Sequence, residues 1–110
     1  MEKILEQTLL YDFYGELLTE HQKQIYEDVV LNDYSFSEIA GECGISRQGV
    51  HDLVKRCNRI LKEYEAKLHL VERFLTVKGR IEEIERSLRD TEEPDREQLI
   101  RQLQDILENL

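Results

Sequence analysis

The chain has 110 residues, a formal net charge of −9, 35% charged residues, one proline and five glycines. This is typical of one compact helical domain, or of one small domain with an appendage, and it allows a modest apolar core. No apolar run approaches ~18 residues, which excludes membrane insertion, and the acids within residues 1–6 exclude a signal peptide. We therefore expect a cytoplasmic protein in which Cys43 and Cys57 are reduced.

Two helices are predicted before residue 32. Between residues 3 and 18, leucines and Phe13 recur at helical spacing with acids between them. Thr19 and Gln22 have the spacing of a capping box, so a second helix should begin there and run to about Leu31. The Asn-Asp-Tyr sequence at residues 32–34 predicts a turn.

Residues 35–57 have the features of a helix-turn-helix, a motif that lays its second helix in the major groove of DNA. Ser35 and Glu38 form another capping box, and Gly44 should end the third helix in the left-handed conformation. Ser46 then caps a fourth helix. An ordinary helical hairpin could show the same apolar stripe, but the small Ala40 and the apolar Ile45 beside the glycine corner favour a helix-turn-helix. The expected buried stripe of the fourth helix comprises Val50, Leu53, Val54, Cys57, Ile60, Leu61 and Tyr64.

The opposite face of this fourth helix carries the side chains that would contact DNA. Arg47 is the type of residue that forms two hydrogen bonds with a guanine edge, and Gln48 can do the same with adenine. The basic residues that follow are suited to contacts with backbone phosphates. The alternative is that these residues form only a solvated helix face. The candidate nucleic-acid-binding residues are Ser46, Arg47, Gln48, His51, Lys55, Arg56, Arg59 and Lys62.

The positive charge is confined to this helix. Residues 46–62 contain five basic residues and one acid, Asp52, a net charge of +4, so the remainder carries −13. Because cellular salt screens charges beyond ~8 Å, a basic stripe on an acidic body is compatible with DNA binding, although non-specific binding should be weak. Gly49 should loosen the helix near its reading end, at a cost of roughly 0.5–1 kcal/mol relative to Ala.

Two more helices are predicted after residue 66, joined by a loop at residues 90–95 in which Pro94 should be an early residue of the last helix. A short loop implies an antiparallel hairpin. Its apolar seams either close on each other or are completed by a second copy, and the small area of a two-helix hairpin favours a homodimer through these helices. The seam residues, in alternating steps of four and three, are Leu70, Phe74, Val77, Ile81, Ile84 and Leu88, then Leu99, Leu103, Ile106 and Leu110.

The sequence offers no set of residues for catalysis, for a metal or for a cofactor. Cys43 and Cys57 fall on apolar helix positions and should be buried thiols. His21, His51 and His69 lack the spacing of a zinc site. No nucleophile–base pair and no phosphate-binding glycine loop is present. We predict a protein that is not an enzyme and that has no metal site or cofactor.

Four ordered segments make the chain resemble the YlxM family of small bacterial proteins. They are Leu-Leu-Thr-Glu-His-Gln at 17–22, Asn-Asp-Tyr-Ser-Phe-Ser-Glu-Ile-Ala at 32–40, Ile-Ser-Arg-Gln-Gly-Val at 45–50 and Tyr-Glu-Ala-Lys-Leu at 64–68. The resemblance implies an all-α fold: a sigma-70 region 4-like helix-turn-helix bundle of the winged-helix-like superfamily at residues 1–66, followed by a C-terminal helical hairpin at residues 67–110.

The resemblance also implies a DNA-binding regulatory protein linked to the signal recognition particle, because the family's genes neighbour those of the particle's GTPase and receptor. Gly49 and His51 stand where Ala and Tyr are common in the family. A second function stays open, that of an accessory that docks on the particle's GTPase or RNA without binding DNA. Residues 1–34, with a net charge of −6, suit a basic partner of that kind.

Overall fold

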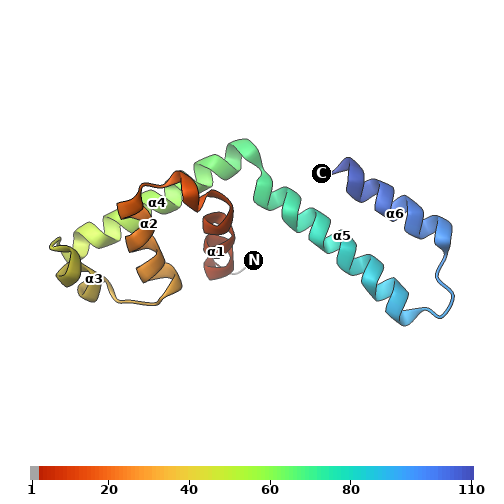
Figure 1. Cartoon of the computed structure of the whole chain (residues 1–110), viewed down its shortest axis with the longest axis horizontal. Helices are drawn as coiled ribbons and strands as arrows, with labels where there is room; N and C mark the ends of the chain where they lie inside the picture. Colours follow the sequence, from red (N-terminus) through yellow and green to blue (C-terminus); the bar gives the residue numbers. More distant parts are fainter. Residues whose placement is uncertain (1–2) are drawn as a thin grey trace. The chain divides into compact units, whose positions relative to one another are not determined.

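The computed structural model describes residues 3–110, and these residues form helices and no strand (Figure 1). This confirms the all-α helix-turn-helix fold. The contacts divide the chain into two units, Met1–His69 and Leu70–Leu110. No helix of the described part is long and apolar enough to cross a membrane. The elements are α1 (Lys3–Tyr14), η1 (Gly15–Leu17), α2 (Glu20–Tyr26), η2 (Glu27–Leu31), α3 (Phe36–Cys43), α4 (Arg47–Leu68), α5 (Leu70–Asp90) and α6 (Arg96–Glu108).

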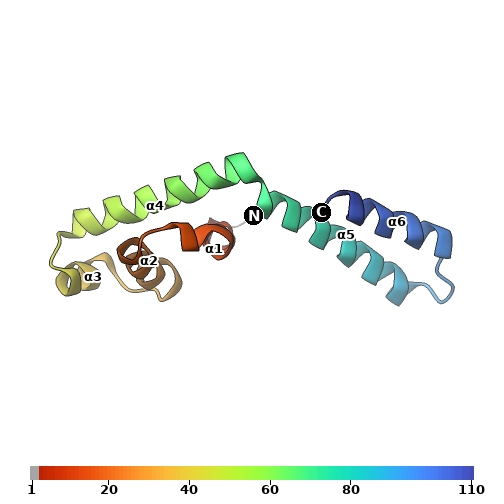
Figure 2. The same cartoon turned by 45° about the horizontal axis from the view of Figure 1, so that its top comes forward.

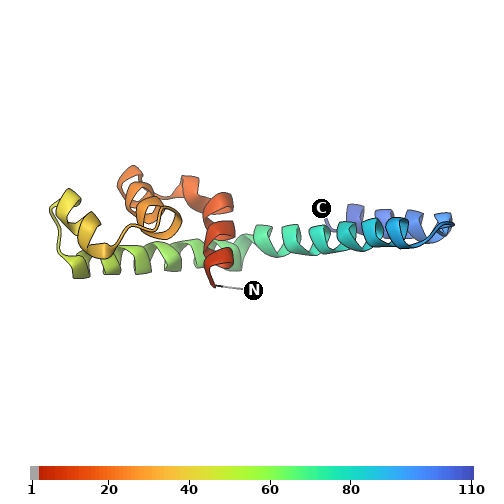
Figure 3. The same cartoon turned by 90° about the horizontal axis from the view of Figure 1, so that it is seen from below.

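The first unit is built on the long helix α4. Figures 2 and 3 show α1, α2 and α3 gathered on one side of α4, which leaves its other side uncovered. The expected apolar stripe of α4 faces the packed helices: Val50, Val54, Cys57 and Leu61 are buried, while Leu53, Ile60 and Tyr64 are partly buried. The core of this unit also contains Leu10, Tyr14, Leu18, Ile25, Tyr26 and Ile39.

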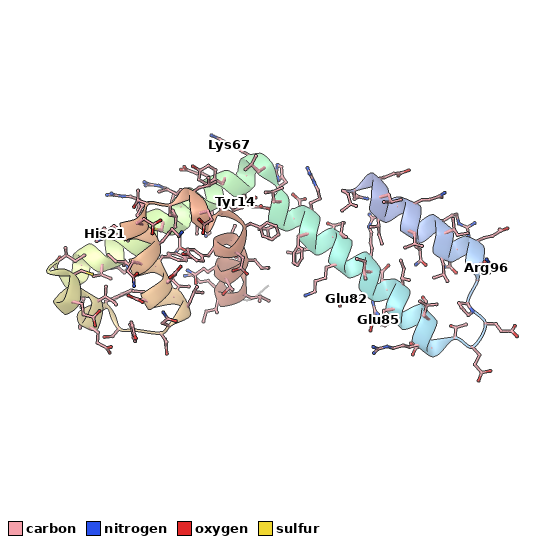
Figure 4. All side chains as sticks on the ribbon, in the orientation of Figure 1. Tyr14, His21, Lys67, Glu82, Glu85 and Arg96 are labelled. Carbon is pink, nitrogen blue, oxygen red and sulfur yellow. The ribbon has the colours of Figure 1, made fainter. Side chains whose placement is uncertain are left out.

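Tyrosine hydroxyls tie the first two helices to their neighbours. Tyr14 in α1 donates a hydrogen bond to Glu65 Oε1 of α4 at 2.5 Å, and Figure 4 labels this tyrosine where α1 faces α4. Tyr26 in α2 donates to Asn58 Oδ1 of α4 at 2.6 Å. Both tyrosines are almost completely buried, and burial raises the pKa of Tyr26 well above its ordinary value. These bonds satisfy buried hydroxyls while fixing α4 against α1 and α2.

The first predicted helix was too long, and its buried face was only partly right. α1 ends at Tyr14 and continues as the short 3-10 helix η1. Leu10 and Leu18 are buried as the leucine pattern suggests, but Leu5 and Leu17 are more than half exposed. The chain leaves the α-helical path at Gly15, where a Cβ would lie 2.9 Å from the ring of Tyr11. Residues after this point therefore no longer follow the helical spacing.

The helix ends follow the predicted caps with one exception. Thr19 and Gln22 form both bonds of the first capping box, and the helix continues as the π-helical segment η2 to Leu31, as predicted. Ser35 accepts the bond from the backbone N–H of Glu38, but the Glu38 carboxylate accepts from the Ser35 hydroxyl rather than from its backbone. The second capping box therefore has only one of its two expected hydrogen bonds, the one from the Glu38 backbone N–H to the Ser35 side chain.

The turn between α3 and α4 is the one predicted. Gly44 has a φ of 68°, and the side chain of Ser46 accepts a hydrogen bond from the backbone N–H of Gly49 at 2.9 Å. Cys43, immediately before the turn, is exposed, so the prediction that both thiols are buried was wrong for Cys43 and right for Cys57. The last turn of α3 presents Cys43 to solvent although its neighbour Ile39 is buried.

The second unit is a hairpin of α5 and α6 (Figure 1). Asp95 caps α6 by accepting from the backbone N–H groups of Glu97 and Gln98. Pro94 therefore precedes the cap and is not the early helical residue that we predicted. Arg80 forms an ion pair with Asp105 across the hairpin, and Ile106 is buried. Much of the predicted seam remains exposed, including Ile81, Leu88, Leu103 and Leu110.

Candidate nucleic-acid interface

The candidate residues predicted from the sequence are all exposed, on α4 or at its N-cap, and Figure 3 shows that one side of α4 is left uncovered. Because a helix turns by about 100° per residue, a stripe buried at Val50, Val54, Cys57 and Leu61 leaves the opposite arc to solvent. We call this arc the basic face of α4. Its predicted members, all exposed, are Ser46, Arg47, Gln48, His51, Lys55, Arg56, Arg59 and Lys62.

The beginning of the basic face is held by the helix cap. Because the Ser46 hydroxyl accepts from Gly49 N–H, its proton and one lone pair remain to contact a ligand. A Cβ on Gly49 would lie 3.1 Å from that hydroxyl oxygen. The absence of a side chain at Gly49 therefore leaves space for the capping hydroxyl of Ser46. The sequence predicted only that Gly49 loosens the helix and did not include this role. Arg47 begins the helix directly beside this cap.

The middle of the basic face contains a polar cluster around Asp52. The Gln48 side chain donates from Nε2 to Asp52 Oδ1 at 3.0 Å, and His51 Nδ1 lies 3.6 Å from the same oxygen. The His51 ring makes an edge contact with Phe36 of α3, with 5.6 Å between the ring centres. Sequence reasoning placed Asp52 on this face and counted its charge, but it did not assign a contact to it. The spacing of Gln48 and Asp52, four residues apart on one helix, was the available signal for their contact.

The second half of the basic face borders a hollow in the surface of the first unit. The hollow is lined mainly by cations from two helices, Lys3 of α1 together with Lys55, Arg56, Arg59 and Lys62 of α4, and its lining also includes the acids Asp52 and Glu63. Lys3 escaped the sequence interpretation because some 50 residues separate it from these partners. Arg59 also lies 3.9 Å from Glu63, but both side chains are largely exposed, so this ion pair is too weak to neutralise the site.

Asn58 is a further member of this hollow that sequence reasoning missed. Its Oδ1 accepts from the buried Tyr26 hydroxyl, which orients the amide so that Nδ2 carries the donors that remain. Such donors suit a phosphate oxygen. No sequence signal connects Tyr26 with Asn58, because they are 32 residues apart and on different helices.

Comparisons with known proteins agree with this fold. A family model, UPF0122, described as "Putative helix-turn-helix protein, YlxM / p13 like", matches residues 1–107. A UPF0122 protein of Thermoanaerobacter sp. strain X514 is 43% identical over 96 residues, which cover 87% of this chain and 82% of that protein. One from Acetivibrio thermocellus is 50% identical over 76% of this chain and 72% of its own length. One from Lactococcus lactis subsp. cremoris is 38% identical over 96% and 91%.

Proposed function

Because the chain belongs to the UPF0122 family of YlxM/p13-like proteins, as its sequence resemblance predicted, we propose that it is a DNA-binding regulatory protein. The observation that carries the proposal is the basic face of α4, which α1, α2 and α3 leave uncovered (Figure 3). Residues 46–62 carry a net charge of +4 in a chain of net −9. DNA is the polyanion that a helix-turn-helix with such a second helix suits. In this role the protein acts in the bacterial cytoplasm.

The two halves of α4 have different tasks in this proposal. The first half enters the major groove, as the second helix of sigma-70 region 4-like motifs does, with Arg47 on a guanine edge and with Ser46, Gln48 and His51 beside it. The second half contacts phosphates through Lys55, Arg56, Arg59 and Lys62, with Lys3 and Asn58 at the border of the hollow. Phosphate contacts fix the register, and base contacts supply the specificity.

The test is duplex binding by a doubly substituted protein. A preferred sequence is first selected from a random duplex pool with the wild-type protein. Arg47→Ala with Arg59→Ala should abolish specific binding, because one base contact and one phosphate contact are lost together. In a salt series, four phosphate contacts predict a slope of about −3.6 for log affinity against log salt.

The matched control is Arg89→Ala with Arg96→Ala, which removes two exposed arginines from the hairpin. This control should bind the selected duplex as the wild type does. Wild-type affinity in the Arg47/Arg59 variant would show that the basic face does not bind DNA.

A second candidate function is favoured by the acidic surfaces. Residues 1–34 carry a net charge of −6 and residues 70–110 a net charge of −4. We propose as the alternative that these surfaces dock on a basic partner, the GTPase of the signal recognition particle, or that the basic face binds the particle's RNA. A pull-down at low salt with a positive control tests both. The absence of both partners from the captured material would contradict this alternative.

We also propose that the hairpin joins two copies of the chain. Phe74, Val77 and Ile81 line a groove together with Lys78, Glu82 and Glu85, and Figure 4 shows the two glutamates on the side of α5 that α6 leaves open. In a two-fold interface each contact occurs twice, with the roles exchanged. An antiparallel pairing of two α5 helices near Ile81 would place Lys78 of each copy opposite an acid of the other, so the groove is complementary to itself.

A further inference from the structure

We infer that Gln48 and Asp52 act as one acceptor surface that selects cytosine in the major groove. This inference deepens the proposed DNA-binding function and rests on it. It assigns a specificity-determining role to Asp52, the one acidic residue within residues 46–62. A carboxylate in the middle of a face that must approach phosphates lowers the general attraction for DNA. Its place there is explained if it recognises a base.

The carboxylate of Asp52 is held by one hydrogen bond and lies close to the ring of His51. Gln48 donates to Oδ1 from the preceding turn of α4, and His51 Nδ1 lies 3.6 Å from the same oxygen. The ring of His51 in turn rests edge-on against Phe36 of α3. The side chain of Asp52 remains 60% exposed. It is therefore oriented in advance and still accessible to a base, as readout requires.

The hydrogen bond between the two side chains changes what Gln48 can read. One of its two Nε2 hydrogens is committed to Asp52, so the amide is less suited to the bidentate adenine contact that the sequence predicts. Gln48 Oε1 and Asp52 Oδ2 accept no hydrogen bond from any described residue, so both remain available as acceptors. The pair therefore presents two acceptors and the one N–H that Gln48 retains, whereas an isolated glutamine presents one acceptor and both of its N–H donors.

Acceptors at this position select the base that offers a donor. In the major groove cytosine presents only its N4 amino group, whereas guanine presents two acceptors and thymine presents O4. A carboxylate facing those acceptors would be repelled. Adenine offers both a donor and an acceptor, so it should be tolerated less well than cytosine. Arg47 at the start of the helix is a donor and therefore pairs with the two acceptors of guanine. The selected sequence should contain both a guanine and a cytosine.

The test compares three proteins in selection from a random duplex pool. The wild-type protein should enrich duplexes that have cytosine at one fixed position. Asp52→Asn should lose that preference by about tenfold, because an amide donates as well as accepts, and its affinity for unselected duplex should rise. The control is Glu63→Gln, which removes the same charge from an exposed site on the same helix. It should raise general affinity and keep the cytosine preference.

Two results would overturn the inference while leaving the proposed function intact: selected duplexes with no fixed cytosine, or an Asp52→Asn variant that keeps the wild-type preference. A wild-type protein that selects no sequence and binds no duplex overturns the proposed function and this inference with it. Because Asp52 is exposed, the variant should fold normally, which its helical circular dichroism will verify.

Discussion

Cys43 and Cys57 are the same residue type in opposite environments. Cys57 is completely buried between α4 and the helices packed on it, and this burial raises the pKa of its thiol to about 11. Cys43 lies exposed at the end of α3. The thiolate is the reactive form of cysteine, so the fold makes Cys57 a packing residue and leaves Cys43 as the thiol that reagents can reach.

The buried thiol predicts how stability depends on pH. Cys57 keeps its proton to about pH 11 in the folded protein, whereas an ordinary thiol releases it near 9.0. The unfolded chain therefore binds fewer protons between these values, so the free energy of unfolding falls as pH rises through them and is unaffected below them. At pH 10.5 the loss from this group should be about 2 kcal/mol.

Urea unfolding at pH 8 and pH 10.5 measures this effect. Cys57→Ala should destabilise the protein at pH 8, and its deficit relative to the wild type should shrink at pH 10.5. Cys43→Ala, which removes the exposed thiol, should follow the pH dependence of the wild type. A deficit for Cys57→Ala that is equal at both pH values would contradict the assigned pKa.

At the scale of the elements, the ends of helices and the two faces of α4 could be predicted because they depend on neighbours in sequence. The cap at Thr19, the left-handed Gly44 and the stripe along α4 all follow from spacings of four residues or fewer. What joins α1 and α2 to α4 could not be predicted. Tyr14 and Tyr26 join Leu10 and Leu18 as core residues, and the partners of their hydroxyls are 51 and 32 residues away.

In the candidate site too, features that depend on sequence neighbours could be predicted, and contacts between distant residues could not. The basic face follows from periodicity, since fixing the buried stripe fixes the exposed arc. Lys3 joins that arc only when α1 packs on α4, and Asn58 gains its orientation only from Tyr26. The hydrogen bond between Gln48 and Asp52 is local, yet spacing alone did not distinguish it from two solvated side chains.

The turn that leads from α3 into α4 can be tested at two glycines, Gly41 within α3 and Gly44 at its C-cap. Gly44 has a φ of 68°, so Gly44→Ala should destabilise the protein by about 1–2 kcal/mol because a Cβ is strained in this conformation. Gly41 is helical and exposed, and a Cβ there would meet nothing within 4 Å. Gly41→Ala should therefore stabilise by up to about 1 kcal/mol.

Urea denaturation of both variants gives the comparison, with each serving as the control for the other. The substitutions are chemically identical and three residues apart, so they differ only in backbone conformation and surroundings. If both alanines stabilise, Gly44 does not adopt the left-handed conformation that places α4 after the turn.

For the whole molecule, the charge distribution restricts how the protein could approach DNA in the proposed function. Residues 46–62 are positive and the rest of the chain carries −13. Screening within ~8 Å keeps the acidic parts from cancelling the basic face, while their repulsion of phosphates disfavours any other orientation. The hairpin adds exposed apolar groups rather than positive charge. Its contribution is therefore expected to be association with a second copy, which would bring two reading helices to one DNA site.

The proposed dimer can be tested through the groove on α5. Ile81 is 51% exposed and lines the groove, so Ile81→Glu should place a charge in the dimer interface and leave the hairpin of each copy folded. Sedimentation equilibrium should give the wild type about twice the chain mass of 13.1 kDa and the variant that mass itself.

Leu107→Glu is the matched control, because Leu107 is a still more exposed apolar residue that lies on α6 and outside the groove. This control should remain dimeric. A two-fold dimer also predicts that duplexes selected by the wild type contain inverted repeats, whereas those selected by Ile81→Glu contain single half-sites. A wild-type protein that sediments at 13.1 kDa at every concentration, or equal dissociation of both variants, would show that this groove does not join two copies.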